Sequence, residues 1–309
     1  MSEFPPRLNL IQRAMKQAQA GNPARTEPTL GAPPASLKAD IDGLAAPAPE
    51  KRPEPIPTPG AHKFAGDITL NYARLRESRI ALPGDRNSLT FNEFRSVKRK
   101  LLPLTARSGT DRRAQNIVMV TSALPAEGKT FTSINLAITL ATEKNLDVIL
   151  VDGDVIRGSL GKYFSGQNSR GLIDLFSNTP GSIDDVLHRC RDLPNLHVIF
   201  SGTQNDTAPE LFASARMAEI CDGLSRRFPQ SIIVIDSPPV LATSEPAALV
   251  THIDHLIMVV AAGRSNRHQV ETAVSALSSC RSMFLLLNKA PKWQRPSQGS
   301  YYYSGSPAP

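Results

Sequence analysis

Residues 116–144 read NIVMVTSALPAEGKTFTSINLAITLATEK, and this stretch decides the fold. An apolar run typical of a strand leads into ALPAEGKT at 123–130, and a segment with helical periodicity follows. The loop fits the phosphate-binding pattern GxxxxGK[ST], with Ala123 in place of the first glycine. Because a helix N-terminus offers free N–H groups and the positive end of the helix dipole, the stretch predicts a site for nucleotide phosphates.

Each residue type in this loop has a chemical reason to be there. Gly128 lets the backbone approach a phosphate without an intervening side chain. Lys129 is expected to reach the β and γ phosphates, and the Thr130 hydroxyl is expected to bind Mg²⁺. The loop therefore predicts ATP and Mg²⁺ as ligands. The residues expected to contact the nucleotide here are Ala126, Glu127, Gly128, Lys129, Thr130 and Phe131.

From residue 116 onward, short apolar runs alternate with longer amphipathic stretches. The runs lack polar alternation, which is typical of strands covered on both faces by helices. We therefore expect an α/β fold with a doubly wound, mostly parallel sheet. The runs after the phosphate loop are DVILVD (147–152), LHVIFS (196–201), SIIVID (231–236), HLIMVVA (255–261) and MFLLLN (283–288).

Aspartates stand at the ends of two of these runs. Asp152 and Asp154 have i, i+2 spacing, which places both carboxylates on the same side of an extended chain. Asp236 ends the run at 231–236. The carboxyl ends of strands in a doubly wound sheet face the ligand crevice, so the loop and the three aspartates are expected to converge there. A single aspartate at a strand end could equally be a helix cap, and it is the combination that favours catalysis.

Composition sets the N-terminal part of the chain apart. Residues 1–20 contain RLNLIQRAMKQAQA, whose apolar residues have helical spacing, so a short amphipathic helix is expected. Residues 21–65 are expected to be a disordered linker, because 12 of the 26 prolines lie in the first 60 residues. Such a composition cannot bury enough apolar surface to offset chain entropy.

Three further segments complete the predicted organisation. Residues 66–110 are expected to be a helical lead-in segment, 111–290 the α/β domain, and 291–309 a flexible polar tail. A helix is predicted from about Thr90 through FNEFRSVKRKLL, with its basic residues on the outer face. Its inner face is expected to carry Phe91, Phe94, Val97 and Leu101.

The net charge of +7 is unevenly distributed. Residues 95–113 carry seven basic side chains and one acid, Asp111. This basic patch indicates either an anionic partner, such as a membrane surface, an acidic protein tail or nucleic acid, or simply a solvated helix face.

Cysteine usage and hydropathy indicate a reducing compartment. Cys190, Cys221 and Cys280 are far apart and show no metal-binding pattern, so they are expected to be buried thiols. No apolar run reaches the length of about 18 residues needed to span a membrane, and no secretory signal is evident. The sequence therefore predicts a cytoplasmic protein.

The same residues resemble the bacterial tyrosine kinases, P-loop autokinases that regulate exopolysaccharide chain length and export. The resemblance spans roughly residue 70 to the C-terminus. TSALPAEGKTFTSINLA is similar to their Walker A region, VILVDGDVIRGSL to their second Walker A-type motif, and IIVIDSPP to their Walker B motif. The N-terminal organisation resembles in particular the soluble autokinases of exosortase-linked polysaccharide systems.

The resemblance implies a role for each site residue. Lys129 and Thr130 would bind phosphate and Mg²⁺, and Asp154 and Asp236 would position the metal. Asp152 would accept the proton of the attacking tyrosine hydroxyl, making it catalytic together with Lys129 and Asp154. Members of this family are autophosphorylated in trans on a C-terminal tyrosine cluster. The matching residues in this chain are Tyr301, Tyr302 and Tyr303.

The resemblance also implies partners. These are further copies of the chain in a ring, a separate membrane-spanning chain-length determinant (co-polymerase) that recruits the kinase to the inner face of the membrane, and a cognate tyrosine phosphatase. Nucleic acid is not expected. Family members form rings through an acidic residue followed at three-residue steps by two basic ones. Here that register reads Asn92, Arg95 and Lys98, so the acid is either lost or supplied by the neighbouring Glu93.

Other functions remain open on the sequence. A partition or cell-division ATPase switch would carry a signature lysine at the position of Leu124, and the basic stretch at 95–113 would suit such a switch. A third alternative is an inactive module that senses nucleotide without turnover. The presence of Lys129 and of the three aspartates argues against it. An iron-sulfur carrier on this fold would need paired cysteines at a dimer seam. Two smaller departures from the kinase pattern are Ala126 for glycine and Gly158 for proline.

Overall fold

The computed structural model describes residues 63–105, 115–165, 170–176, 182–202, 208–212 and 214–291. The helix expected at 1–20, the linker up to residue 62 and the tail from residue 292 onward lie outside these residues. The elements discussed below therefore belong to the part that begins at Lys63.

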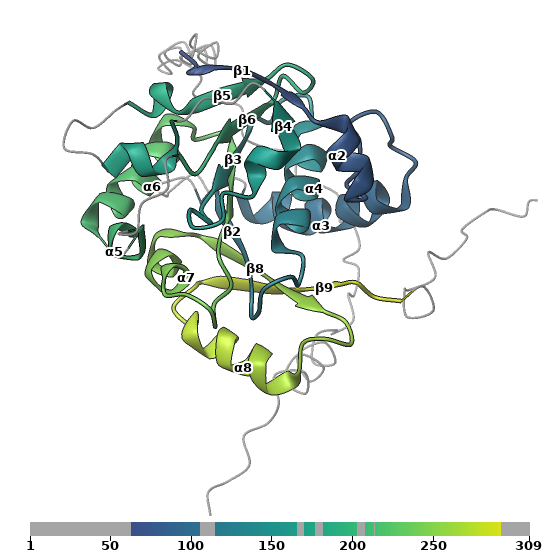
Figure 1. The fold of residues 1–309 in the computed structure, drawn as a ribbon, viewed down its shortest axis with the longest axis vertical. Helices are drawn as coiled ribbons and strands as arrows, with labels where there is room; N and C mark the ends of the chain where they lie inside the picture. Colours follow the sequence, from purple (N-terminus) through teal and green to yellow (C-terminus); the bar gives the residue numbers. More distant parts are fainter. Residues whose placement is uncertain are drawn as a thin grey trace, which may run out of the picture. The chain divides into compact units, whose positions relative to one another are not determined.

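A nine-stranded sheet forms the centre of this part, in the order β4-β1-β5-β6-β3-β7-β2-β8-β9 (Figure 1). The six strands from β6 to β9 are mutually parallel, as expected. At the other edge β5 is antiparallel to β6, and β4 is antiparallel to β1. The strands are β1 (Gly66–Leu70), β2 (Ile117–Ser122), β3 (Val148–Asp152), β4 (Phe164–Ser165), β5 (Leu187–Cys190), β6 (Leu196–Ile199), β7 (Ile232–Asp236), β8 (His255–Ala261) and β9 (Ser282–Asn288).

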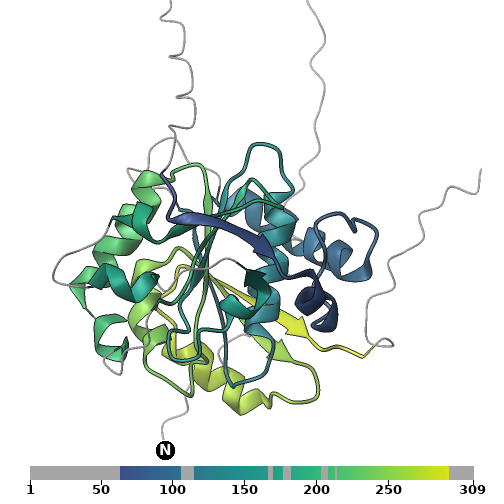
Figure 2. The same cartoon turned by 45° about the horizontal axis from the view of Figure 1, so that its top comes forward.

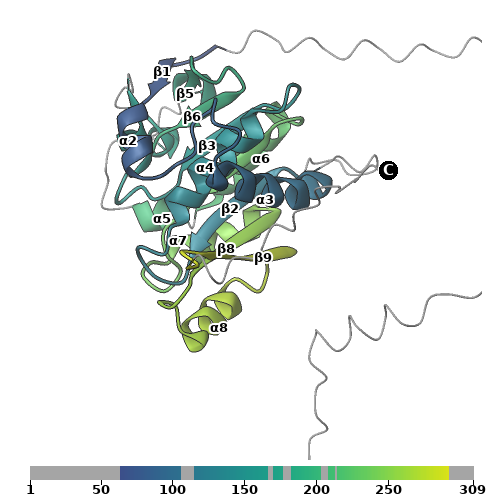
Figure 3. The same ribbon diagram turned by 90° about the vertical axis from the view of Figure 1, so that its right-hand side faces the viewer.

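Helices cover both faces of the sheet, which Figure 2 shows nearly edge-on. One face carries α2 (Tyr72–Glu77), α3 (Leu89–Thr105) and α4 (Lys129–Ala141). The other face carries α6 (Ala215–Arg227), α7 (Glu245–Leu249) and α8 (Arg267–Ala276), and the short α5 (Ala208–Phe212) packs against α6 and α7. Figure 3 shows α8 at the end of the sheet formed by β8 and β9.

The central strands are buried on both faces because side chains alternate along each strand. In β3, Ile149 and Val151 belong to the core under α6, whereas Val148 and Leu150 belong to the core under α4. Every residue of β2, β3 and β7 is buried. This explains why their sequences are continuous apolar runs without polar alternation.

The segment before residue 111 contributes a strand as well as helices. β1 pairs with β5 in parallel and with β4, and it extends the sheet on the side away from β9. The helix predicted from about Thr90 to Leu102 is confirmed as α3. One expectation about α3 was wrong: Lys98 is buried rather than on the outer face, because its ammonium group donates to Thr139 O (3.3 Å) and to Glu143 Oε1 (2.6 Å) at the C-terminal end of α4.

Candidate active site

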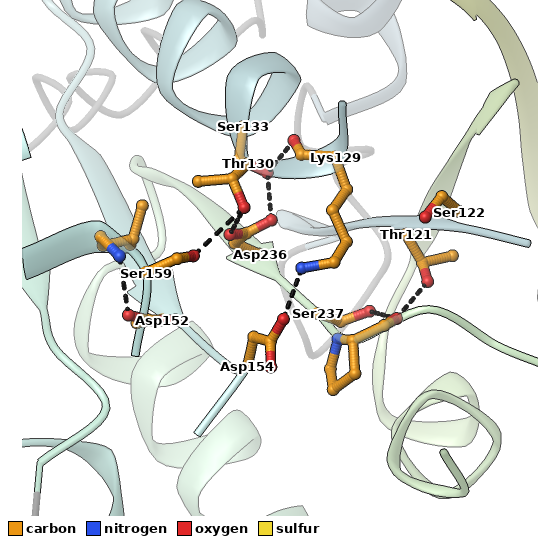
Figure 4. Close-up of polar contacts among 12 residues, drawn as sticks. Thr121, Ser122, Lys129, Thr130, Ser133, Asp152, Asp154, Ser159, Asp236 and Ser237 are labelled. Atoms are coloured by element: carbon orange, nitrogen blue, oxygen red, sulfur yellow. Dashed lines mark hydrogen bonds and ion pairs between the residues drawn. The ribbon is translucent and has the colours of Figure 1, made fainter. Parts of the chain in front are cut away.

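The phosphate loop leaves β2 at Ser122 and ends where α4 begins at Lys129. Two of its residues adopt left-handed backbone conformations, Ala126 with φ of 64° and Gly128 with φ of 104°. The value at Gly128 strongly favours glycine, which lacks the Cβ that would clash there. The loop thus turns sharply and presents the first turn of α4 at the carboxyl end of the sheet, as the sequence predicts (Figure 4).

Lys129 lies at the centre of the site. Its Nζ atom is 2.5 Å from Asp154 Oδ2, and both side chains are buried. Asp154 follows β3 in the loop that leads to Ser159, so this ion pair joins the start of α4 to the segment after β3.

Asp236 ends β7 and accepts hydrogen bonds from two hydroxyl groups of α4. Thr130 Oγ1 donates to Asp236 Oδ2 at 2.7 Å, and Ser133 Oγ donates to Asp236 Oδ1 at 3.0 Å. Burial raises the pKa of the Asp236 carboxyl, while the charge of Lys129 and these hydrogen bonds lower it. The hydroxyl groups therefore stabilise the ionised form of this buried carboxylate.

Asp152 is the register partner of Asp236 on the adjacent strand β3. Its Oδ2 atom accepts the N–H of Leu160 at 3.1 Å, and within the described residues Oδ1 has no hydrogen-bond partner. Burial, followed by the negative charge of Asp236, raises the pKa of the Asp152 carboxyl to about 8. A carboxyl group with such a pKa can exchange a proton near neutral pH.

The structure brings together the five residues on which the predicted chemistry depends. Lys129, Thr130, Asp152, Asp154 and Asp236 lie around one point at the ends of β3 and β7 (Figure 4). The roles carried by the resemblance remain predictions for each of them. Tyr301, Tyr302 and Tyr303 lie outside the described residues.

Two other expected contact residues have side chains engaged within the protein. Glu127 is 3% exposed, and its carboxylate accepts the N–H of Leu124 and the hydroxyl of Ser265. Phe131 packs against Phe94 of α3 with ring centroids 6.0 Å apart. Any contact with phosphate at these two positions would therefore come from the backbone.

Several site residues were missed by the sequence reasoning. Ser133 could have been found, because it lies three residues after Thr130 on the same helix face. Ser159 Oγ, 3.2 Å from Thr130 Oγ1, lies in a loop with no periodicity to reveal it. Asn288, at the end of β9, donates from Nδ2 to Glu127 O at 2.9 Å.

A magnesium ion fits the oxygen atoms at this site. Mg²⁺ usually keeps several waters and is bound through one or two carboxylates together with substrate phosphates. Thr130 Oγ1 and Asp236 Oδ2 lie 2.7 Å apart directly beside the phosphate loop and offer this type of ligand. Among the described residues, no group of three or more His, Cys, Asp or Glu side chains is arranged to hold a metal ion.

Comparisons with known proteins identify the family. No family model matches the chain. The tyrosine-protein kinase CpsD of Streptococcus pneumoniae is 32% identical over 179 residues, which make up 56% of this chain and 75% of CpsD. The chain belongs to the bacterial tyrosine-protein kinase family. The kinase domain of the Escherichia coli tyrosine kinase ETK has the same fold, with a TM-score of 0.59 and 19% identity over 74% of this chain and 92% of that domain.

A second relative of this kinase is much longer than the chain itself. The putative tyrosine-protein kinase EpsB of Ralstonia nicotianae is 34% identical over 162 residues, 52% of this chain. These residues are only 21% of EpsB, so the chain spans about a fifth of the length of that relative. Within the described residues, no helix combines the length and the apolar character required to cross a membrane.

Proposed function

We propose that this protein is an ATP- and Mg²⁺-dependent protein-tyrosine autokinase that phosphorylates its own tyrosines Tyr301, Tyr302 and Tyr303 in trans. The observation that carries the proposal is the cluster of Lys129, Thr130 and three buried aspartates beside the phosphate loop. Family membership supports the choice of tyrosine as acceptor.

Lys129 and Thr130 would bind the nucleotide. Since Lys129 pairs with Asp154, its ammonium group would exchange this carboxylate for the β and γ phosphates when ATP binds. The released Asp154 would join Thr130 and Asp236 as an oxygen ligand or as an acceptor for metal-bound water. Mg²⁺ held there would neutralise negative charge on the phosphates during transfer.

Asp152 would serve as the proton acceptor. The phenolic oxygen of a tyrosine attacks the γ phosphorus, the bond from this phosphorus to the β–γ bridging oxygen breaks, and ADP leaves with the electron pair. The phenolic proton passes to the Asp152 carboxylate. Without ligands the pKa of about 8 keeps this carboxyl mostly protonated at neutral pH, and the positive charge of bound Mg²⁺ would favour the ionised form that accepts the proton. Alignment and charge neutralisation supply most of the remaining catalysis.

The wider assignments rest on the resemblance in the sequence. We propose a role in exopolysaccharide polymerisation and export, with a membrane co-polymerase, a tyrosine phosphatase and further copies of this chain as partners. Recruitment to the inner face of the membrane would occur through the co-polymerase. Within the expected ring element, Lys98 is bonded to α4 of its own chain, whereas Arg95 is exposed and its Nη1 lies 3.3 Å from Asn92 Oδ1. Arg95 is therefore the better candidate for a contact between subunits.

An ATPase switch of the partition type is less well supported. Leu124 stands where such proteins carry their signature lysine, and its side chain is partly buried against the core under α6. An apolar side chain packed in this way has no charge to offer to the phosphates of a partner subunit.

Incubation with labelled ATP and Mg²⁺ tests the proposal. The full chain is expected to form phosphotyrosine, the variant Lys129→Met none, and the triple variant Tyr301→Phe, Tyr302→Phe, Tyr303→Phe little. Tyr72→Phe is the matched control. Tyr72 begins α2, which follows β1 near the edge of the sheet, and the candidate active site lies at the ends of the central strands β3 and β7. Release of free phosphate without phosphotyrosine, measured with the co-polymerase present, would replace the kinase assignment with that of an ATPase switch.

A further inference from the structure

Two segments that have no role in the proposed chemistry form hydrogen bonds to the phosphate loop. One is the turn between β8 and α8, which contains Ser265. The other is the end of β9, which contains Asn288 and continues into Lys289. The first segment bonds to Glu127 of the loop, and the second bonds to both Ala126 and Glu127.

The carboxylate of Glu127 joins the loop to the first of these segments. It is almost fully buried, accepts the hydroxyl of Ser265 on Oε1 and accepts the N–H of Leu124 on Oε2 at 2.8 Å. The same hydroxyl accepts the N–H of Ala261 at 2.9 Å. Ser265 thus connects the last residue of β8 to the middle of the phosphate loop.

The end of β9 holds the backbone carbonyls of the loop. Asn288 Nδ2 donates to Glu127 O at 2.9 Å, and Lys289 Nζ donates to Ala126 O at 2.5 Å. Asn288 Oδ1 accepts the N–H of Lys289 at 2.8 Å, which fixes the amide orientation. A Cβ atom at Gly128 would lie 2.0 Å from Asn288 Nδ2, so this side chain also requires a glycine there.

These contacts determine which way the amide groups of the loop point. In a planar trans peptide the C=O and the following N–H point in opposite directions. Bonds that draw the carbonyls of Ala126 and Glu127 toward the end of β9 therefore turn the N–H groups of Glu127 and Gly128 away from it. Backbone N–H groups of such loops are the groups that bind nucleotide phosphates.

We propose that Ser265, Asn288 and Lys289 are positioning residues that set the affinity for nucleotide by fixing the direction of the loop amides. The inference deepens the proposed function, since it rests on a nucleotide being the ligand of this loop. None of the three residues needs to touch the phosphoryl group that is transferred. Their removal should weaken nucleotide binding much more than it slows transfer at saturating ATP.

A titration of the full chain with a fluorescent ATP analogue and Mg²⁺ tests this inference. Asn288→Asp replaces the donor to Glu127 O with a negatively charged acceptor, and it is expected to raise the Kd at least about tenfold, because a partly buried hydrogen bond is lost and repulsion is added. Ser265→Ala should have a similar effect and Ser265→Thr, which keeps the hydroxyl, should restore part of the affinity. Lys289→Met should raise the Kd by roughly threefold, because this side chain is exposed.

The control is Ser279→Ala, at an exposed position just after α8, which should leave the Kd unchanged. The rate of phosphotyrosine formation at saturating ATP should change less than about twofold in the positioning variants. An unchanged Kd in Ser265→Ala and Lys289→Met, or an unchanged Kd with a reduced maximal rate, overturns the inference. Lys289→Met decides the matter if Asn288→Asp does not fold. Binding is measured separately from phosphoryl transfer. A protein whose variants bind as expected but that forms no phosphotyrosine would therefore refute the kinase proposal and leave the inference about the loop intact.

Discussion

Lys129 and Asp154 form a buried ion pair in which Nζ and Oδ2 lie 2.5 Å apart and the side chains are only 8% and 3% exposed. Removing two charges from water is unfavourable, and the pair offsets this only while both partners are present. The two residues are not equivalent, however. Lys129 also lies in the field of Asp152 and Asp236, since its charge lowers the pKa of both carboxyls.

This asymmetry predicts different effects for the two single substitutions. Lys129→Met leaves three neighbouring aspartates without a cation and should lower the free energy of unfolding by about 3 kcal/mol. Asp154→Asn should cost less, because Lys129 keeps the attraction of the Asp236 carboxylate. Urea denaturation without nucleotide measures both values.

The double variant Lys129→Met, Asp154→Asn provides the control for this pair. It should be more stable than Lys129→Met alone, because it removes one uncompensated buried charge, yet it should form no phosphotyrosine. If the single and double lysine variants were equally stable, the ion pair would have no energetic role in the folded protein.

The pKa of Asp152 predicts how stability depends on pH. Its carboxyl keeps its proton in the folded protein up to about pH 8, whereas the unfolded chain loses this proton near pH 4. Between these values the folded state binds more protons, so stability falls as the pH rises, by about 1.4 kcal/mol per pH unit from this group. Asp152→Asn should flatten this part of the curve.

Unfolding of the wild type and of Asp152→Asn at pH 5, 6, 7 and 8, with a chelator present, checks this dependence. The two curves should diverge as the pH rises, with the variant becoming the more stable protein. Parallel curves would show that Asp152 titrates near its ordinary value. Burial also raises the pKa of Asp236. This residue is present in both proteins, so it contributes to both curves.

The convergence of the site could be predicted from the sequence because it follows from topology. Asp152 and Asp236 end apolar runs long enough for buried strands, and parallel strands bring such ends to one edge of the sheet. The loop pattern and the helix after it are local features, visible within residues 116–144. Local periodicity and one rule about parallel sheets were therefore sufficient for this part.

The remaining features depend on tertiary contacts that leave no periodic pattern. β1, β4 and β5 have the sequences GDITL, FS and LHRC, which contain no continuous apolar run, so their pairing at the sheet edge was not recognised. The bonds from Ser265 and Asn288 to Glu127 join positions more than 130 residues apart. Lys98 was expected on the solvent side of α3, and only its partners explain why it is buried: Thr139 in α4 and Glu143 just after this helix.

Those partners predict that Lys98 stabilises the packing of α3 on α4. Lys98→Met should lower the free energy of unfolding by about 2 kcal/mol, because Glu143 and the carbonyl of Thr139 lose a charged donor. Arg99→Met, at the next and exposed position, should change it by less than about 0.5 kcal/mol. Equal losses in chemical denaturation would mean that the contact with α4 contributes nothing.

Ser133 and Thr132 are adjacent buried residues of α4 with opposite expected responses to the loss of a hydroxyl group. Ser133 Oγ donates to Asp236 Oδ1 at 3.0 Å, whereas within the described residues Thr132 Oγ1 has no partner. Ser133→Ala should therefore destabilise the protein by about 1 to 3 kcal/mol, while Thr132→Val should be neutral or slightly stabilising. Loss of this donor also raises the pKa of Asp236 further, so Ser133→Ala should need more Mg²⁺ for half-maximal nucleotide binding. Denaturation and Mg²⁺ titration of both variants measure these effects, and matching behaviour of the two would show that Asp236 does not depend on the Ser133 hydroxyl.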